Sequence, residues 1–262
     1  GSFVLHCKNL CPGINRIMNP FSLQGKRILI TGASSGIGKA SAKAVAEMGA
    51  SVILSGRNEA KLKEARDALE GQHLIIEADL TKDTDREKLV EACGSLDGVV
   101  NGAGIVRPFP AKFIQDKQIR EMWGINYEAQ VLLTSQLLRK NKINEDGSLV
   151  FISSISSLFA YKGGALYAGS KAALNAYSKT LALECAGKRI RSNCILAAMV
   201  KTAIFEEAEA IDHEAMVRHG KDYPLGFGEP EDVANAVVFL LSPASRWITG
   251  TNLIMDGGLT AG

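Results

Sequence analysis

The chain has 262 residues, of which 46% are hydrophobic, and its 30 Lys and Arg against 28 Asp and Glu leave a formal charge of +2. This composition predicts a compact folded protein and argues against a disordered one. The basic residues are scattered along the chain, so we do not expect nucleic acid as a partner.

Three features of the sequence predict a cytoplasmic location. No stretch approaches the roughly 18 to 20 apolar residues that cross a bilayer, and the first residues lack the pattern of a secretion signal. Five cysteines, an odd number, do not form a disulfide framework in a chain of this length, so reduced thiols are expected. Cys7 and Cys11 are close in sequence, but no second pair of Cys or His completes a zinc site, and we expect no metal.

The first predicted segment, residues 1–22, shows neither strand nor helix periodicity. We expect an N-terminal arm or residues added at cloning, with Met18 as a plausible natural start. From Arg27 onward, short apolar runs alternate with stretches of helical period, which is typical of parallel βαβ units. The expected strands are Arg27–Thr31, Ser51–Ser55, His73–Glu77, Gly98–Asn101, Ser148–Ile152, Arg191–Leu196 and Asn252–Met255. The expected helices are Gly38–Met48, Glu59–Leu69, Thr84–Cys93, Ile119–Arg139, Tyr167–Cys185 and Glu231–Leu241.

These strands are nearly continuous runs of Val, Ile and Leu, so helices should cover both faces of their sheet. The pattern predicts an α/β fold of the Rossmann-like, doubly wound kind, with a seven-stranded parallel sheet in a three-layer sandwich. No linker or composition shift divides the chain, so residues 23–262 are expected to form one dinucleotide-binding catalytic domain.

Residues 202–227 interrupt this alternation between the sixth strand and the last helix. Apolar residues such as Ile204 and Phe227 are mixed there with charges, Gly220 and Pro224. We expect a mobile lid over a substrate site, the alternative being a fixed pair of surface helices.

A glycine-rich turn follows the first strand and precedes the first helix. Glycines allow the backbone to approach a pyrophosphate closely, and the amides and dipole at a helix start favour its negative charge. In this position of a doubly wound sheet, the turn predicts a dinucleotide site. Its candidate binding residues are Gly32, Ser34, Ser35, Gly36, Ile37 and Gly38.

The end of the second strand bears on the choice of cofactor. It reads Ser55, Gly56, Arg57, Asn58, without the carboxylate that would accept a hydrogen bond from the adenosine ribose 2′-hydroxyl. Arg57 offers a planar set of donors to a 2′-phosphate, so NADP(H) is favoured over NAD(H). The alternative interpretation is a solvent-exposed arginine in a loop.

Tyr167 and Lys171 are four residues apart at the start of a predicted helix, which puts both side chains on one face. A neighbouring ammonium lowers the pKa of a phenol from about 10 and makes it a usable proton donor or acceptor. Ser154 follows the fifth strand, at the edge of the sheet where ligands bind in such folds, so its hydroxyl is a candidate to hold a substrate oxygen.

Taken together, these motifs resemble the short-chain dehydrogenase/reductase family over about Leu23 to Gly258. The resemblance rests on several ordered motifs, which are more specific than any one alone. They are TGASSGIG at Thr31–Gly38, Asp79, NGAG at Asn101–Gly104, Asn126, Ser154, Tyr167 with Lys171, and DGG at Asp256–Gly258.

The resemblance implies a role for each catalytic residue. Tyr167 would be the general acid or base, and Ser154 would orient and polarise the carbonyl. Lys171 would lower the pKa of the tyrosine and hold the nicotinamide ribose, and Asn126 would anchor a water that links Lys171 to solvent. The further cofactor contacts that it implies are Asp79 and Leu80 at the adenine, Asn101, Ala103 and Gly104 along the cofactor, and Val200 and Thr202 at the nicotinamide amide.

Two departures from the family pattern concern the site. Ala197 and Ala198 stand where relatives commonly carry Pro-Gly, which puts the detailed shape of the nicotinamide and substrate pocket in doubt. Gly102 replaces an Asn or Ala that is frequent in relatives, which is a smaller change.

The function that this resemblance implies is transfer of hydride between NADP(H) and a small-molecule carbonyl or secondary alcohol. A 3-oxoacyl thioester is the leading substrate candidate, because such reductases are common among relatives. The alternative is a catalytically silent NADP(H)-binding sensor or scaffold, against which the presence of all four catalytic residues argues. Relatives are often dimers or tetramers joined through the helices near Ile119–Arg139 and Tyr167–Cys185, so we expect a homo-oligomer, a homotetramer or a dimer.

Overall fold

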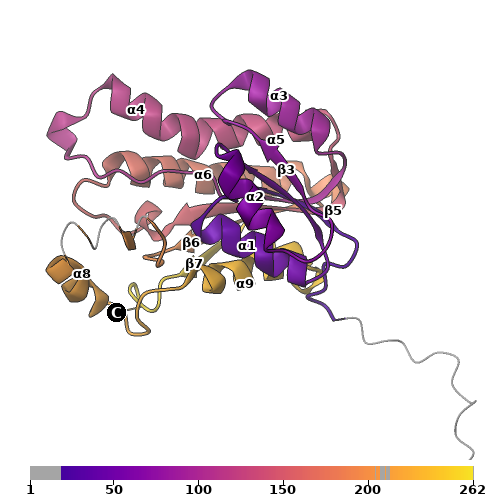
Figure 1. Ribbon diagram of the computed structural model, residues 1–262. Coiled ribbons are helices and arrows are strands. Elements are labelled where there is room, and N and C mark those ends of the chain that lie inside the picture. The colour runs from indigo at the N-terminus through magenta and orange to yellow at the C-terminus, as the bar shows by residue number, and fades with distance from the viewer. Residues whose placement is uncertain (1–18, 204, 207–209, 211–212, 262) are drawn as a thin grey trace, which may run out of the picture.

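Seven parallel strands form one sheet at the centre of the protein (Figure 1). The computed structural model describes residues 19–203, 205–206, 210 and 213–261. The strands stand in the order β3-β2-β1-β4-β5-β6-β7, so the chain starts at the middle of the sheet and builds outward in both directions. Their bounds are β1 Arg27–Thr31, β2 Ser51–Gly56, β3 Leu74–Glu77, β4 Leu96–Asn101, β5 Ile143–Ser154, β6 Arg191–Ala197 and β7 Asn252–Met255.

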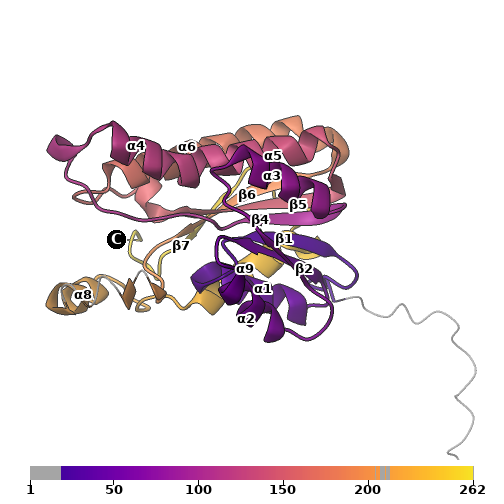
Figure 2. The ribbon, with the colours of Figure 1, turned by 45° about the horizontal axis from the view of Figure 1, so that its top comes forward.

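Helices cover both faces of this sheet, which confirms the expected three-layer fold (Figure 2). On one face lie α1 (Gly36–Glu47), α2 (Glu59–Asp67) and α9 (Pro230–Leu241). The opposite face carries α3 (Asp83–Ala92), α4 (Asp116–Trp123), α5 (Ala129–Arg139) and α6 (Ala165–Glu184). One further helix, α8 (His213–Gly220), lies beyond the end of the sheet near the C-terminus (Figure 1). Short 3-10 turns occupy Ala111–Phe113, Ile155–Ser157, Ala186–Lys188 and Pro243–Ser245.

A separate hydrophobic core fills each side of the sheet. Val45, Leu54 and Val237 are among the fully buried residues on the side of α1 and α9. Leu89 and Phe151 are among those on the side of α3, α5 and α6. The strands carry apolar residues on both of their faces because both faces are covered, as their sequence pattern predicts.

One expected helix is interrupted in the structure. The sequence pattern predicts a single helix over Ile119–Arg139, but a π-turn at Gly124–Glu128 separates α4 from α5. In this turn the amide of Ala129 donates to the carbonyl of Gly124, five residues back. The wider turn shifts the helical phase, and Asn126 within it is fully buried.

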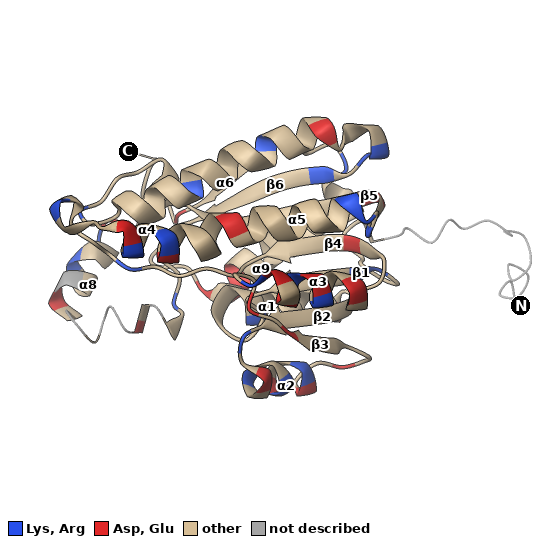
Figure 3. Cartoon of the chain, turned by 90° about the horizontal axis from the view of Figure 1, so that it is seen from above, with Lys and Arg blue, Asp and Glu red and all other residues tan. Residues whose placement is uncertain are grey.

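Charged residues are interspersed on the outer surfaces of the helices. Figure 3 shows Lys and Arg beside Asp and Glu on α2, α3 and α4. None of the described helices is both long and apolar enough to cross a membrane. Of the predicted N-terminal arm, residues 1–18 lie outside the described residues, whereas the carbonyl of Pro20 accepts a hydrogen bond from the amide of Ala244 (2.9 Å).

Candidate active site

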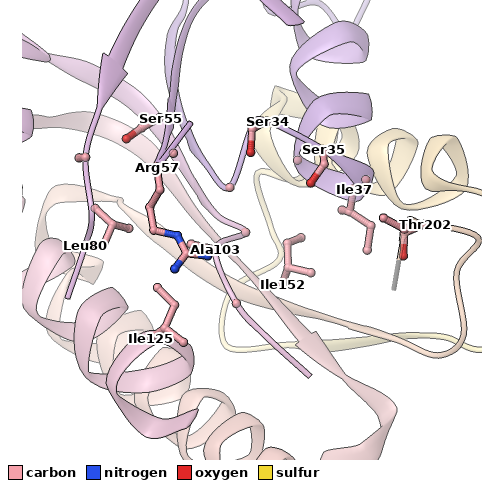
Figure 4. Close-up of a pocket in the computed structure, with 18 residues that line it drawn as sticks. Ser34, Ser35, Ile37, Ser55, Arg57, Leu80, Ala103, Ile125, Ile152 and Thr202 are labelled. Carbon is pink, nitrogen blue, oxygen red and sulfur yellow. The ribbon is translucent and has the colours of Figure 1, made fainter. Parts of the chain in front are cut away.

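A cavity opens where the carboxyl ends of β1, β2 and β4 meet the start of α1 (Figure 4). It lies at the point where the strand order reverses, the usual ligand position in a doubly wound sheet. Eleven of the sixteen predicted cofactor-binding residues line it, and the other lining residues come from the ends of β2, β3, β4 and β5, from the turn after α4 and from the segment after β6. The lining is Gly32, Ser34, Ser35, Gly36, Ile37, Gly38, Ser55, Gly56, Arg57, Ala78, Leu80, Gly102, Ala103, Gly104, Ile125, Ile152, Thr202 and Ala203.

The glycine-rich turn forms one wall of the cavity, and its glycines are sterically required. A Cβ on Gly38 would lie 2.2 Å from the carbonyl oxygen of Gly32, and a Cβ on Gly32 would lie 2.9 Å from the amide nitrogen of Ala103. Gly32 and Gly36 also have positive φ angles of 69° and 50°. No acidic residue occupies the first turn of α1. The wall therefore fits a pyrophosphate at a helix start.

Arg57 projects from the end of β2 into this cavity, between Leu80 and Ala103 (Figure 4). It also borders a shallow hollow lined by Glu77, Asp79, Lys82, Asp85 and Lys88. Burial raises the pKa of Asp79, but hydrogen bonds from Thr81 and the charges of Lys82 and Arg57 outweigh it and hold that pKa below the ordinary value. A guanidinium therefore stands at the adenosine end of the predicted dinucleotide site.

Asp79 and Leu80 lie next to each other but differ in position. The Asp79 carboxylate accepts hydrogen bonds from the amide (3.1 Å) and hydroxyl (2.7 Å) of Thr81, whereas Leu80 is buried in the cavity wall. The Nη1 of Arg86 donates to the Leu80 carbonyl at 2.7 Å, and its Nη2 binds Asp83. Sequence reasoning missed this buried arginine, because an Arg within a polar helix resembles any surface cation.

Asn101 and Thr31, the last residues of the neighbouring strands β4 and β1, have different surroundings. Asn101 is fully buried and is not among the residues that line the cavity, so the structure does not bring it to the predicted cofactor border. Thr31 Oγ1 instead accepts hydrogen bonds from the amides of Gly102 (3.1 Å) and Ala103 (3.3 Å). A Cβ on Gly102 would lie 2.8 Å from the carbonyl of Thr31, so the loop after β4 packs against β1 more closely than an Asn or Ala would allow.

Asn126 fastens this same loop from the other side. Its Oδ1 accepts from the amide of Ile105 (2.8 Å) and its Nδ2 donates to the carbonyl of the same residue (2.9 Å). A Cβ on Gly104 would lie 3.0 Å from Asn126 Oδ1 and 3.6 Å from Lys171 Nζ. The glycine thus marks the point at which the buried asparagine and the lysine approach each other.

Three of the four catalytic residues expected from the sequence lie together at the carboxyl end of β5. Ser154 is the last residue of the strand, and Tyr167 and Lys171 lie in the first turns of α6. The Nζ of Lys171 lies 5.8 Å from the centre of the Tyr167 ring, and the Ser154 side chain is near enough to the phenol to lower its pKa. Ser154 Oγ also contacts Ser156, to whose hydroxyl it donates at 3.0 Å.

The pKa of Tyr167 differs from the expectation. Burial raises it to about 12, the interaction with the Ser154 side chain lowers it in part, and Tyr161 adds to the increase. Lys171 is not among the groups that shift this pKa, and burial lowers the pKa of Lys171 itself to about 8. The isolated protein therefore holds a protonated phenol beside a lysine whose charge is easily lost.

The segment after β6 carries two further predicted cofactor contacts, Val200 and Thr202, and only one of them reaches the cavity. Thr202 lines the cavity, whereas Val200 is buried and pairs with Gly228. At the departure from Pro-Gly, Ala197 is a paired residue of β6, and the amide of Ala198 donates to the carbonyl of Met255 at 2.9 Å. This extra bond continues the pairing of β6 with β7 toward the site.

Part of the expected lid lies beyond this segment. Ile204 and residues 207–209 and 211–212 are outside the described residues. The rings of Phe205 and Phe227 are 5.1 Å apart, and that of Tyr223 lies 5.0 Å from Phe227 and 5.2 Å from His219. An aromatic cluster therefore holds α8 against the chain on either side of it.

Among the residues that the structure describes, no group of three or more His, Cys, Asp or Glu is placed to hold a metal ion. Cys7 and Cys11 lie outside those residues.

Comparisons with known proteins agree with this geometry. The family model described as enoyl-(acyl carrier protein) reductase matches residues 32–260. The chain is 35% identical over 238 residues to a 3-oxoacyl-(acyl-carrier-protein) reductase of Rickettsia felis, covering 90% of this chain and 98% of the relative. It is 33% identical over 253 residues to a tropinone reductase homolog of Arabidopsis thaliana, covering 92% and 94% of the two chains.

Solved structures give the same result. A short-chain type dehydrogenase/reductase from Mycobacterium marinum superimposes with a TM-score of 0.85 at 28% identity, covering 93% of this chain and 98% of that one. A protein described as an NAD(P)-dependent gluconate 5-dehydrogenase from Beutenbergia cavernae, solved with NADP at low occupancy, has a TM-score of 0.84 at 32% identity. The match to the second structure covers 93% of this chain and 100% of that one. The chain therefore belongs to the short-chain dehydrogenase/reductase family of oxidoreductases.

Proposed function

We propose that this oxidoreductase uses NADP(H) in preference to NAD(H) and interconverts a carbonyl compound and its secondary alcohol. The observation that carries the proposal is the meeting of Ser154, Tyr167 and Lys171 beside a cavity whose glycine wall fits a pyrophosphate. The preference for NADP(H) rests on Arg57, which stands at the adenosine end of that cavity without a carboxylate on β2.

The residues of the chain divide the chemistry among them. A bound nicotinamide supplies or accepts the hydride at the carbonyl carbon. The Tyr167 phenol donates its proton to the substrate oxygen during reduction and takes it back during oxidation. The Ser154 hydroxyl turns from Ser156 toward that oxygen and stabilises the charge that develops on it. The Lys171 ammonium would bind the ribose and, with the dinucleotide in place, would stabilise the phenolate, an effect that the protein alone does not show.

We assign Asn126 to the same machinery as the residue that holds the loop after β4 next to Lys171 and anchors a water for proton exchange. Its amide already binds both backbone groups of Ile105, which fixes its orientation. The predicted contact of Asp79 with adenine belongs to the same proposal.

The leading substrate class is a 3-oxoacyl thioester, as the name of the Rickettsia relatives suggests. Leu158, Phe159 and Tyr161 follow Ser154, the last residue of β5, and leave much of their apolar surface exposed. Such a rim suits an acyl chain, because contact with apolar side chains removes the chain from water.

Two further properties belong to the proposal. A cytoplasmic location agrees with Cys93, Cys185 and Cys194, which are free thiols. Assembly into a dimer or tetramer through α5 and α6 agrees with the exposed Leu132 and Leu183 on these helices. Sedimentation at several protein concentrations measures the assembly directly.

A panel of 3-oxoacyl thioesters, ketones and sugars, followed at the nicotinamide absorbance with NADPH and NADH, tests the activity. We expect NADPH-dependent reduction with a thioester among the best substrates. Binding of NADPH without turnover of any compound would favour the alternative of a silent sensor or scaffold.

A further inference from the structure

Gln130 in the first turn of α5 is fully buried, although its side chain is polar. Its Nε2 donates to two backbone carbonyls, that of Ala103 at 2.8 Å and that of Asn126 at 3.1 Å. Its Oε1 is buried without a hydrogen-bond partner in the described structure. Burying Oε1 without a partner costs free energy. We therefore expect the two hydrogen bonds of Nε2 to serve a purpose that offsets this cost.

The two carbonyls belong to two neighbouring parts of the site, the loop after β4 and the π-turn. Ala103 lines the dinucleotide cavity, and Asn126 lies in the π-turn that faces it. The loop after β4 has left the sheet, so its peptide groups cannot find partners in neighbouring strands. Side chains supply them instead. Thr31 accepts from the amides of Gly102 and Ala103, Asn126 binds both groups of Ile105, and Gln130 takes the carbonyl of Ala103.

Gly104 is exposed, and the residues on either side of it in the loop after β4 are held by these hydrogen bonds. Without Gln130, the Ala103 carbonyl would lose its partner, and the loop would be tied to the π-turn through Asn126 alone. A looser loop would cost dinucleotide affinity, because binding would then have to order it.

We propose that Gln130 is a positioning residue that fixes the loop Gly102–Ile105 against the π-turn and thereby preorganises the wall of the dinucleotide cavity. The inference rests on the proposed function only in taking this cavity as the dinucleotide site. Gln130 acts on affinity through Ala103 and Asn126, and it does not contact the reacting atoms.

The test is dinucleotide binding by the full chain, measured by the fluorescence of NADPH without substrate. Gln130→Met keeps the size of the side chain and removes both donors. Gln136→Met is the matched control, since Gln136 is a buried glutamine of the same helix whose Nε2 binds Asp83 at 3.0 Å. We expect Gln130→Met to raise the Kd for NADPH about tenfold, as loss of a buried hydrogen bond would, and Gln136→Met to change it less than about twofold at a similar loss of thermal stability.

Hydrogen exchange supplies a second measurement without dinucleotide. The amides of Gly104 and Ile105 should exchange faster in Gln130→Met and at the unchanged rate in Gln136→Met. If the first variant does not fold, Gln130→Thr, which is smaller and keeps one donor, serves in both measurements with the same expectations. Equal NADPH affinity and equal loop exchange in the variant and the wild type would overturn the proposal. Failure of the wild type to bind NADPH at all would instead overturn the proposed function.

Discussion

The ammonium of Lys171 donates a hydrogen bond to the backbone carbonyl of Ile152, with 2.7 Å between the two atoms. The bond ties α6, which carries Tyr167, to β5, which carries Ser154, so it sets the two catalytic residues against each other. Lys171 is only 4% exposed, and its partner here is a neutral carbonyl. Burial without a carboxylate in that bond explains why the pKa of Lys171 falls to about 8.

The first prediction concerns how the binding of NADPH depends on the charge of Lys171. The charge of Lys171 is lost as the pH rises through about 8, so its contribution to dinucleotide binding should decline above that pH. The measured quantity is the Kd for NADPH between pH 6 and 9.5 in the wild type and in Lys171→Met. We expect weaker binding and no alkaline decline in the variant. Lys179→Met, at an exposed position of the same helix, is the control and should keep the wild-type profile.

The same group predicts a pH dependence of stability. The folded pKa of Lys171 lies below its value of 10.5 in the unfolded chain, so between about 8 and 10.5 the unfolded state binds more protons. The free energy of unfolding of the wild type should therefore rise, relative to that of Lys171→Met, as the pH increases through this window. Urea denaturation at several pH values measures it. If the free energy of unfolding of the wild type instead falls relative to that of Lys171→Met as the pH rises, the result would contradict the burial of a charged ammonium.

The second prediction concerns the phenol. Tyr167→Phe should lower turnover by at least about a thousandfold, because it removes the proton donor, while the Kd for NADPH stays within a few-fold of the wild type. Tyr177→Phe, also in α6 and with its hydroxyl 3.5 Å from the carbonyl of Val131, should keep turnover near that of the wild type. Steady-state kinetics and fluorescence titration give the two quantities. Unchanged turnover in Tyr167→Phe would remove this residue from the catalytic role.

The fold was predictable because its signals are local. Apolar runs and helical periods placed all seven strands, and the strands differ from their expected bounds mainly at β5, which starts earlier, at Ile143. The break between α4 and α5 was not predictable, since a π-turn needs one extra residue in a helix whose apolar period remains nearly intact. Asn126 owes its burial to that turn.

The site was predictable to the extent that its residues stand next to a strand end. The glycine turn, Arg57 and Thr202 reach the cavity for that reason, whereas Asn101 also ends a strand but is fully buried and does not line the cavity. Gln130 was missed because its partner Ala103 is 27 residues away in the sequence, and Arg86 was missed because an arginine in a polar helix resembles a surface cation. The pKa of Tyr167 could not be predicted from spacing, since burial depends on everything packed around the pair.

The third prediction concerns cofactor choice. Arg57→Ala should lower kcat/KM for NADPH by roughly ten- to a hundredfold, since a charge-assisted bond to phosphate is worth about 1.5–3 kcal/mol. The value for NADH should hardly change, because NADH lacks the 2′-phosphate. Lys61→Ala, an exposed cation on α2, is the control and should affect neither. Equal losses with both cofactors would show that Arg57 does not distinguish them.

The fourth prediction concerns the glycine wall. Gly38→Ala places a Cβ 2.2 Å from the carbonyl oxygen of Gly32, so the turn must shift. We expect NADPH binding to fall below detection and the melting temperature to drop by several degrees. Gly187→Ala is the control, since a Cβ there meets nothing within 4 Å. Wild-type affinity in Gly38→Ala would mean that this turn does not bind the dinucleotide.

The last prediction concerns the expected lid at residues 202–227. Thr202 and Ala203 line the cavity, and the bridge between Val200 and Gly228 joins the two ends of the segment. Since α8 is held by an aromatic cluster that includes Phe227, it should move as one unit when the cavity fills. Hydrogen exchange of His213–Gly220 should therefore slow when NADPH and a substrate are added together. Exchange of the turn Ala186–Lys188, which precedes β6 at the edge of the sheet opposite the cavity, is the internal control and should not change. Equal protection of α8 with and without ligands would contradict a lid and favour the alternative of a fixed pair of surface helices.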